Sequence, residues 1–344
     1  MAPAATIELM KQRIAAVPDA LVETLYASDL TIDWAAPVIV TGLGSSQCAA
    51  RLLAGLLTAR CGMPALFVPM TDFYCGSHAR GKTLVVFSQG LSANAHIALA
   101  RRQDYQHCAL VTSATEAGLQ AAGKSTALEL LRSLQAEGAT LIRHPLEDEY
   151  TLLPRFIGPA CALATAIAMA QACAQVNGSL PSPATLREAF DDALATASNA
   201  QEWVNDFAAL PEWNFCGAAV AHCGNLQAKV MECLFVRLPQ ARDWLEFSHG
   251  AFQANCNQPS PQWLFTDSSA AQAELLLQLK PLYQQNPYPL RIIRSPLGFP
   301  FNLLYYELFL NQVVLAAVEQ QSLDLIEWPG KGRDGAGYNL SAPY

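Results

Sequence analysis

Near its N-terminus the chain reads Pro37-Val-Ile-Val-Thr-Gly42-Leu-Gly44-Ser45-Ser46. A second stretch of the same form reads Thr83-Leu-Val-Val-Phe-Ser88-Gln89-Gly90-Leu-Ser92-Ala-Asn94. Each is an apolar, β-branched run that stops in small and polar residues before a helical pattern begins. This layout places backbone N–H groups and hydroxyls at a helix N-terminus, where an anion is favoured. Two such loops in one parallel sheet predict a site for a phosphorylated or polyhydroxylated small molecule.

Short apolar runs alternate with helical patterns along the whole chain, which predicts parallel sheets covered on both faces. In the first half we expect strands at 38–41, 65–69, 84–87, 108–112 and 140–143 between helices at 5–28, 48–59, 94–102, 126–136 and 155–175. In the second half we expect strands at 215–220, 263–266 and 290–293 between helices at 184–210, 226–237, 270–283 and 303–319. The predicted fold class is α/β, with two tandem αβα sandwiches.

The domain organisation follows from the interruptions of this pattern. Two prolines and a glycine in Asn177-Gly-Ser-Leu-Pro-Ser-Pro183 predict a linker. We therefore expect an N-terminal helix at 1–28, a first domain at 29–176, a linker at 177–183, a second domain at 184–327 and a tail at 328–344. The Gly-rich tail is expected to lie across a surface or to fold into a site near the substrate.

Composition excludes several classes of protein. The 344 residues carry a net charge of -8 and no dense basic run, which argues against nucleic-acid binding. The longest apolar stretch, 156–176, is Ala-rich and contains Gly and Pro, so a core helix is favoured over a membrane span. The ten cysteines show no C-x-x-C pair and no zinc spacing, and no secretory signal is evident at the start. Together these features predict a cytoplasmic protein with reduced thiols.

Four motifs resemble those of the sugar isomerase (SIS) family, specifically proteins with two tandem SIS domains. The isomerase half of glucosamine-6-phosphate synthase and the fructosamine-6-phosphate deglycases have this form. The matching segments occur in the family's order over most of the chain, and they are Gly42-Leu-Gly44-Ser45-Ser46, Ser88-Gln89, Gln227-Ala-Lys229-Val-Met-Glu232 and Glu246-Phe-Ser-His249-Gly250. The resemblance implies flavodoxin-like SIS domains and a sugar derivative as ligand.

The sequence also departs from the family pattern. Gly90-Leu-Ser92-Ala-Asn94 stands where the family has Ser-Gly-Glu-Thr, so two hydroxyls that hold the phosphate there are absent from their usual places. Ala251 replaces a proline after His249-Gly250, and the tail lacks the family's Pro-Arg-Asn-Leu-x-Lys ending. These departures indicate a divergent member and leave open a substrate other than a standard hexose phosphate.

The resemblance assigns catalytic roles to three residues. Glu232 corresponds to the carboxylate that moves a proton between C1 and C2 of the open-chain sugar, and its apolar neighbours would raise its pKa toward that task. His249 corresponds to the ring-opening histidine, which reaches the site of the other subunit; a hydrogen-bonded turn histidine is the alternative. Lys331 in the tail is a third candidate, although a tail lysine can be merely solvated. The resemblance implies a homodimer with the site at its interface, no cofactor and no metal.

The candidate ligands of the sugar or its phosphate lie mainly in the two loops. They are Gly44, Ser45, Ser46, Ser88, Gln89, Ser92 and Asn94, with Thr151 added by analogy with the family. Helix N-capping uses the same residue types at the same places, and both roles can hold at once. The acidic run Glu147-Asp-Glu-Tyr150 is expected to be a solvated loop.

Three functions compete. The first is an enzyme that isomerises, deaminates or deglycates a phosphorylated sugar or amino sugar. The second is a non-catalytic sugar-phosphate sensor, which the altered loop after Gln89 favours and the pair Glu232 and His249 disfavours. The third, a nicotinamide-dependent dehydrogenase, fits poorly because Gln47 stands in place of the third glycine of the dinucleotide motif.

Overall fold

A computed structural model describes residues 2–27, 30, 32–144, 146, 149–174 and 180–340. The chain divides into two compact units, each with a sheet of its own. The first-sheet unit comprises Asp19–Thr151, Ile157–Leu180 and Glu327–Tyr344, and the second-sheet unit comprises Met1–Pro18, Leu152–Phe156 and Pro181–Ile326. The predicted domain boundaries stay predictions, and residues 177–179 of the predicted linker lie outside the described residues.

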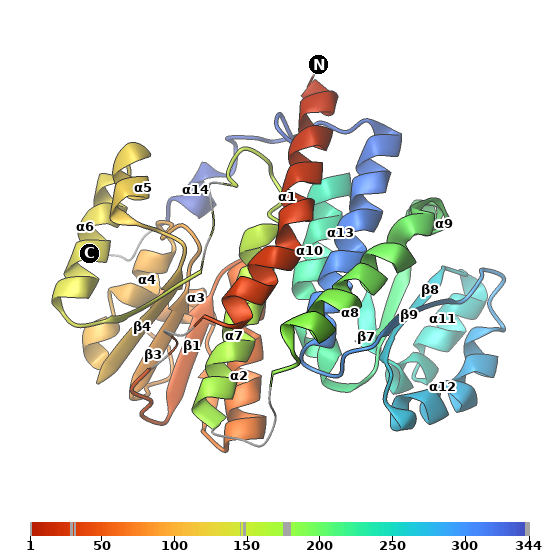
Figure 1. The fold of residues 1–344 in the computed structure, drawn as a ribbon, viewed down its shortest axis with the longest axis horizontal. Helices are drawn as coiled ribbons and strands as arrows, with labels where there is room; N and C mark the ends of the chain where they lie inside the picture. Colours follow the sequence, from red (N-terminus) through yellow and green to blue (C-terminus); the bar gives the residue numbers. More distant parts are fainter. Residues whose placement is uncertain are drawn as a thin grey trace. The chain divides into compact units, whose positions relative to one another are not determined.

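The first-sheet unit contains five parallel strands in the order β2-β1-β3-β4-β5 (Figure 1). This is the order of flavodoxin-like folds, in which ligands bind beyond the carboxyl ends of the strands. The strands are β1 (Val38–Gly42), β2 (Ala65–Phe67), β3 (Thr83–Phe87), β4 (His107–Thr112) and β5 (Thr140–Arg143). The helices are α2 (Ser45–Cys61), α3 (Met70–Tyr74), α4 (Ala95–Leu99), α5 (Glu116–Ala121), α6 (Ser125–Ala136), α7 (Ile157–Ala174) and α14 (Gly335–Tyr338).

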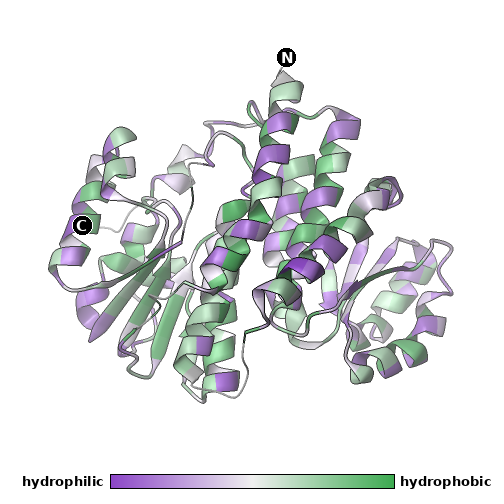
Figure 2. Cartoon of the chain, viewed as in Figure 1, coloured by the Kyte–Doolittle hydropathy of each residue, from purple (hydrophilic) through white to green (hydrophobic). Residues whose placement is uncertain are grey.

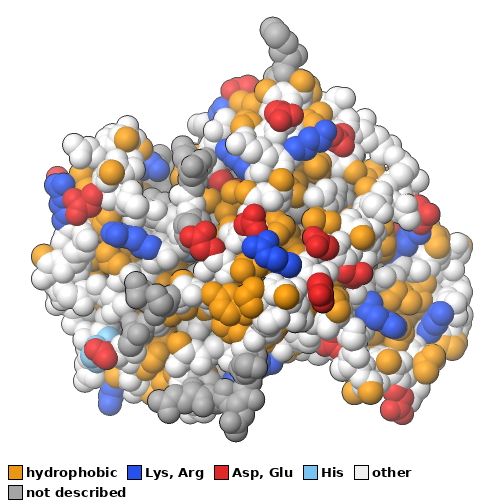
Figure 3. All heavy atoms as spheres, viewed as in Figure 1, with side chains coloured by type: hydrophobic (Ala, Val, Ile, Leu, Met, Phe, Trp, Pro, Cys, Tyr) orange, Lys and Arg blue, Asp and Glu red, His pale blue; other side chains and the backbone are white. Residues whose placement is uncertain are grey.

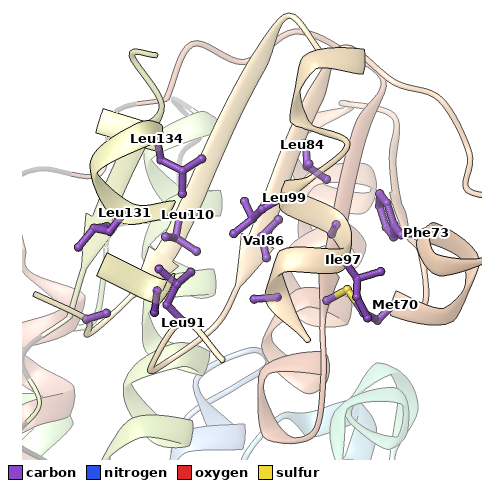
Figure 4. Close-up of a cluster of buried hydrophobic side chains, with 14 of the residues drawn as sticks. Met70, Phe73, Leu84, Val86, Leu91, Ile97, Leu99, Leu110, Leu131 and Leu134 are labelled. Atoms are coloured by element: carbon purple, nitrogen blue, oxygen red, sulfur yellow. The ribbon is translucent and has the colours of Figure 1, made fainter. Parts of the chain in front are cut away.

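The central strands of this sheet are buried on both faces, as their continuous apolar sequences predict. Every residue of β1 and β3 is buried, and Figure 2 shows these strands largely in green. On one face, Leu84 and Val86 of β3 pack with Leu99 of α4, while Leu110 of β4 packs with Leu134 of α6 (Figure 4). On the other face α2 packs against α7 and against β1.

The second-sheet unit has four parallel strands in the order β7-β6-β8-β9, which repeats the first four positions of the other sheet. The strands are β6 (Glu212–Phe215), β7 (Ala241–Asp243), β8 (Gln262–Asp267) and β9 (Arg291–Ser295). The helices are α8 (Pro183–Thr196), α9 (Ala200–Asp206), α10 (Gly224–Leu234), α11 (Ala251–Asn257), α12 (Ala270–Tyr283) and α13 (Asn302–Gln321). Helix α13 is buried along most of its length and contacts α8, α9 and α10. The N-terminal helix α1 (Ala2–Leu25) is divided between the two units at Pro18.

One predicted strand is wrong. The strand expected at 215–220 lies earlier in the chain, at Glu212–Phe215, and Gly217–His222 forms a 3₁₀ helix. Gly217 has a φ of 67°, a left-handed conformation that breaks the extended backbone. The small apolar residues after Cys216 favour a strand by sequence pattern alone, although they form the 3₁₀ helix. The edge strand β7 was missed because it is three residues long and includes two charged residues, Arg242 and Asp243.

The predicted fold class is confirmed: the protein is α/β with two all-parallel sheets. All ten cysteines carry free thiols. Among the described residues, no helix has the length and apolar character needed to cross a membrane. On the face drawn in Figure 3, Lys and Arg side chains lie scattered among Asp and Glu side chains, as expected for a sequence without a dense basic run.

Candidate functional site

The loop between β1 and α2 brings two backbone segments into close contact. A Cβ atom added to Gly42 would lie 2.7 Å from the carbonyl oxygen of Ser46, so only glycine fits there. Gly44 has a φ of 61° and directly precedes α2, whose start no side chain caps. Ser45 and Ser46 form the first turn of this 17-residue helix and are half-buried. The helix start therefore presents hydroxyls and backbone donors in the arrangement that favours an anion.

The loop after β3 is tied to the loop after β4. The backbone oxygen of Gln89 accepts hydrogen bonds from the Thr112 hydroxyl at 3.0 Å and from the backbone N–H and hydroxyl of Ser113 at 3.0 and 2.8 Å. Ser88 is buried, and its N–H donates to the carbonyl of Val111 at 2.9 Å. Of the two serines predicted in this loop, Ser88 thus lies inside the fold and Ser92 is exposed.

The side chain of Gln89 lies against the start of α7. A Cβ atom added to Gly158 would lie 2.2 Å from Oε1 of Gln89, so the glycine makes room for this amide. The Nε2 atom of Gln89 is buried and has no hydrogen-bond partner among the described residues. A buried amide donor without a partner is costly, which marks this position as one where a ligand oxygen would be stabilised.

Glu149 caps the N-terminus of α7, a role that the sequence did not reveal. Its two carboxylate oxygens accept hydrogen bonds from the backbone N–H groups of Ile157 and Gly158, each at 2.9 Å, and the residue is 1% exposed. A carboxylate at a helix N-terminus is stabilised by the helix dipole and by the otherwise unpaired donors. The prediction of a solvated acidic loop is therefore wrong for Glu149, while Glu147 and Asp148 lie outside the described residues.

Asn94 binds the C-terminal tail. Its Nδ2 atom donates to the backbone carbonyls of Gly337 at 3.0 Å and Leu340 at 2.9 Å. The side chain is 5% exposed, and both of its donor hydrogens are accounted for by these two bonds. The tail thus packs onto the first-sheet unit through the short helix α14, which the glycine-rich sequence did not predict. A role of Asn94 as a substrate ligand stays a prediction.

The remaining candidates of the first-sheet unit are exposed. Thr151 and Lys331 both have exposed side chains. The ammonium of Lys331 lies 2.8 Å from the Glu327 carboxylate and 4.8 Å from the centroid of the Trp328 ring. These contacts join Lys331 to residues three and four positions earlier in the chain, and its catalytic role stays a prediction.

Glu232 lies in the last turns of α10 in the second-sheet unit and is half-buried. Burial raises the pKa of Glu232 to about 7, against the opposing effect of the positive charges of Arg155 and Lys229. The predicted apolar setting of this carboxylate is the cause, since desolvation disfavours its charged form. A carboxylate with such a pKa exchanges protons readily near neutral pH, which is what a general base requires.

A buried polar cluster lies beside Glu232 on the same helix. Lys229, one turn before Glu232, donates to the carboxylate of Glu307 and to Oδ1 of Asn311. The other oxygen of Glu307 accepts from the amide of Asn225 at 2.8 Å. The Lys229 ammonium lies 5.2 Å from the centroid of the Phe156 ring. No sequence pattern indicated this cluster, because Glu307 and Asn311 lie in an otherwise apolar helical pattern.

His249 follows the 3₁₀ helix Leu245–Ser248, and its side chain is exposed. Its backbone N–H donates to the carbonyl of Glu246 at 3.0 Å, and the Glu246 carboxylate accepts from the backbone N–H of Asp243 at 3.1 Å. Glu246 thus closes the turn that presents His249. Among the described residues, no group of three or more His, Cys, Asp or Glu side chains is arranged to hold a metal ion.

The chain has the fold of several solved phosphosugar enzymes. It is similar to the C-terminal domain of glucosamine-fructose-6-phosphate aminotransferase from Francisella tularensis, with a TM-score of 0.69 and 11% identity over 92% of this chain and 97% of the other. It is similar to glucosamine-6-phosphate deaminase from Thermotoga maritima, with a TM-score of 0.68 and 12% identity over 93% and 97%. Tagatose-6-phosphate ketose/aldose isomerase from Escherichia coli gives a TM-score of 0.67 and 15% identity over 92% and 94%.

These similarities confirm, at the level of the fold, the resemblance to tandem SIS proteins that the motifs indicated. At 11% to 15% identity they do not extend to a particular reaction. No protein-family model matches the sequence, and no curated protein matches it.

Proposed function

We propose that the protein binds a phosphorylated sugar or amino sugar and catalyses a reaction that moves a proton between C1 and C2. This description covers aldose–ketose isomerisation, deamination and deglycation. In each case the sugar's own carbonyl accepts the electron pair that is left when the proton is removed. The reaction therefore requires a positioned base and no redox cofactor.

The observation that carries this proposal is the pKa of Glu232, which burial raises to about 7. A base that removes the C2 proton and returns it to C1 has to gain and lose that proton with comparable ease at the working pH. An exposed surface glutamate, with its ordinary pKa, would hold the proton too weakly. The position of Glu232 on α10, one turn after the buried Lys229, supports a fixed side chain rather than a mobile one.

The other candidates take roles that follow from the family resemblance. His249 would open the sugar ring, and its exposed side chain fits a site completed by a second copy of the chain. The serines at the start of α2 would bind hydroxyl or phosphate oxygens. We therefore also propose a homodimer, and the ten free thiols support a reducing, cytoplasmic setting.

The test is proton exchange in D₂O, followed by proton NMR at C1 and C2 of a panel of sugar phosphates, amino-sugar phosphates and fructosamine phosphates. We expect exchange with one class of compound, and product signals will separate isomerase from deaminase and deglycase. Glu232→Gln should lower the exchange rate by roughly 10²–10⁴-fold while ligand binding persists. Glu188→Gln, an exposed carboxylate of the same unit, is the matched control. Equal exchange rates in the wild type and Glu232→Gln would contradict the proposal.

A sugar-phosphate sensor is the second candidate, and one observation favours it. Asn94, predicted as a ligand, has its amide donors engaged by the tail carbonyls of Gly337 and Leu340. A bound sugar would then compete with the tail and so report its presence through the tail's release. Phosphosugars that raise the melting temperature without any exchange at C1 or C2 would favour this function over the enzyme.

A further inference from the structure

A pocket of about 190 Å³ opens in the first-sheet unit beside the carboxyl ends of β3 and β4. Its polar lining comes from four separate segments, namely the loop after β3, the loop after β4, the connection between α5 and α6, and the segment before α7. The polar residues are Gln89, Ser113, Thr115, Lys124 and Tyr150. Of these, only Gln89 belongs to the loops whose sequence predicted a ligand. The pocket lies at the edge of the sheet where parallel folds bind their ligands.

The pocket contains the positive charge of Lys124. The ammonium of Lys124 lies 4.6 Å from the centroid of the Tyr150 ring, a cation–π contact. Among the described residues no carboxylate lies within ion-pair distance of Lys124, and Glu116, on the neighbouring helix α5, pairs with Arg132 at 2.9 Å instead. Lys124 also immediately precedes α6, a 12-residue helix whose N-terminus no side chain caps. The lysine and the helix start both favour an anion here.

Tyr150 reaches the pocket because position 90 has no side chain. A Cβ atom added to Gly90 would lie 1.8 Å from the Tyr150 hydroxyl oxygen, so this hydroxyl occupies the space where a side chain at position 90 would begin. The glycine therefore lets a tyrosine from the segment before α7 bring its hydroxyl to the loop after β3. The hydroxyl beside the loop after β3 therefore comes from Tyr150, which tertiary packing places there, and not from a residue of the loop itself.

The pocket also offers both donors and acceptors. The Thr115 hydroxyl accepts from the N–H of Gly118 at 3.0 Å, so its own hydrogen is available to a ligand oxygen. The Ser113 hydroxyl donates to the carbonyl of Gln89, which leaves its lone pairs available to a protonated ligand oxygen. Leu119 and Leu146 supply an apolar wall. A volume of about 190 Å³ is smaller than the usual small-molecule site, so the pocket suits one end of a ligand rather than a whole one.

We infer that this pocket binds the phosphate group of a phosphorylated ligand, with Lys124 as its counter-ion and the hydroxyls of Thr115 and Tyr150 as its hydrogen-bond donors. The inference deepens the proposed function and rests on it for the sugar part of the ligand. The phosphate part rests on the hydroxyls and on the charge of Lys124, which has no carboxylate partner in the described part of the chain. It can be tested with inorganic phosphate.

The experiment is isothermal titration of the full chain with inorganic phosphate, then with fructose 6-phosphate, at fixed ionic strength. We expect wild-type binding of phosphate, a loss of affinity of about tenfold or more in Lys124→Gln, and retention of most affinity in Lys124→Arg. Lys82→Gln is the matched control, because Lys82 is an exposed lysine at the opposite, amino end of β3. Its affinity should equal that of the wild type.

Gly90→Ala provides an independent variant. The added methyl group meets the far end of the Tyr150 side chain, which can move away, so the fold should persist while phosphate affinity falls. Tyr150→Phe in the same background should then have no further effect. Equal phosphate affinity in the wild type, Lys124→Gln and Gly90→Ala would overturn the inference, as would absence of phosphate binding by the wild type.

The outcomes separate this inference from the proposed function. C1/C2 exchange that persists while Lys124→Gln binds phosphate normally would overturn the pocket assignment and leave the enzyme in place. A phosphate affinity that depends on Lys124 in a protein without exchange activity would support the pocket and remove the catalytic function.

Discussion

Lys229 and Glu307 form an ion pair inside the second-sheet unit, with 2% and 0% of their side chains exposed. The two residues lie 78 positions apart in the sequence, on α10 and α13. Two charges removed from water are tolerated only when they are paired and hydrogen-bonded, and Asn225 and Asn311 provide the further bonds. The pair fixes the helix that carries Glu232, which links the stability of this unit to its candidate base.

Removal of one partner should therefore destabilise the protein strongly. We expect Glu307→Leu to lower the free energy of unfolding by about 3–5 kcal/mol, because it leaves the Lys229 charge buried and unpaired. The double variant Lys229→Met with Glu307→Leu should recover most of that loss. Urea unfolding checks both values, with Glu116→Gln as the control, since its exposed pair with Arg132 should contribute below about 1 kcal/mol. A double variant as unstable as Glu307→Leu alone would contradict this account.

The pKa of Glu232 predicts a pH dependence of stability. Its folded-state pKa of about 7 lies above the ordinary value of 4.5, so the folded state binds the proton more tightly than the unfolded state. The resulting stabilisation is complete below pH 4.5 and is lost as the pH rises through about 7. Glu232→Gln lacks this titration, so between pH 5 and pH 8 the melting temperature of the wild type should fall relative to that of the variant. A difference that stays constant over this range would refute the shifted pKa.

The same pKa predicts the pH profile of the proposed reaction. A base acts in its deprotonated form, so the exchange rate at C1 and C2 should rise with pH and level off above about pH 7. The measurement is the initial exchange rate at subsaturating substrate. A profile that falls through neutral pH would exclude Glu232 as the base.

Gly42 should tolerate no side chain. In Gly42→Ala the new Cβ would lie 2.7 Å from the backbone oxygen of Ser46, and a backbone atom cannot move aside cheaply. We expect a loss of about 1–3 kcal/mol in the free energy of unfolding. Gly298→Ala is the matched control, since nothing lies within 4 Å of its added Cβ, and it should be neutral within about 1 kcal/mol. Equal unfolding midpoints of the two variants would show that the loop adapts.

Asn94 should hold the C-terminal tail. Asn94→Ala removes the two hydrogen bonds to Gly337 and Leu340, so trypsin cleavage after the exposed residues Lys331 and Arg333 should become roughly tenfold faster. Asn205→Ala, an exposed asparagine of the other unit, serves as the control. Cleavage rates that do not differ between the two variants would argue against a tethered tail.

Hydrophobic periodicity was sufficient to predict most helices and strands, although not all of their boundaries. The helix predicted at 270–283 is α12, and the strand predicted at 140–143 is β5, because hydrophobic periodicity is a property of neighbouring residues. The strand predicted at 215–220 failed where small residues left periodicity ambiguous and Gly217 adopted a positive φ. Glu232 was predicted on an apolar helix and lies on α10 with a raised pKa.

Local sequence was enough to predict the alternation of strands and helices, the Gly-rich loop at Gly42 and the helical setting of Glu232, since each depends on neighbouring residues. Tertiary structure alone decided that Glu149 caps α7, that Tyr150 stands over Gly90, and that Lys229 pairs with Glu307. These contacts join segments that lie far apart or turn back on each other, and a polar side chain's partner is set by which segments the packed core brings together. Hydrophobic periodicity does not predict these polar partners, because it reports only on neighbouring residues.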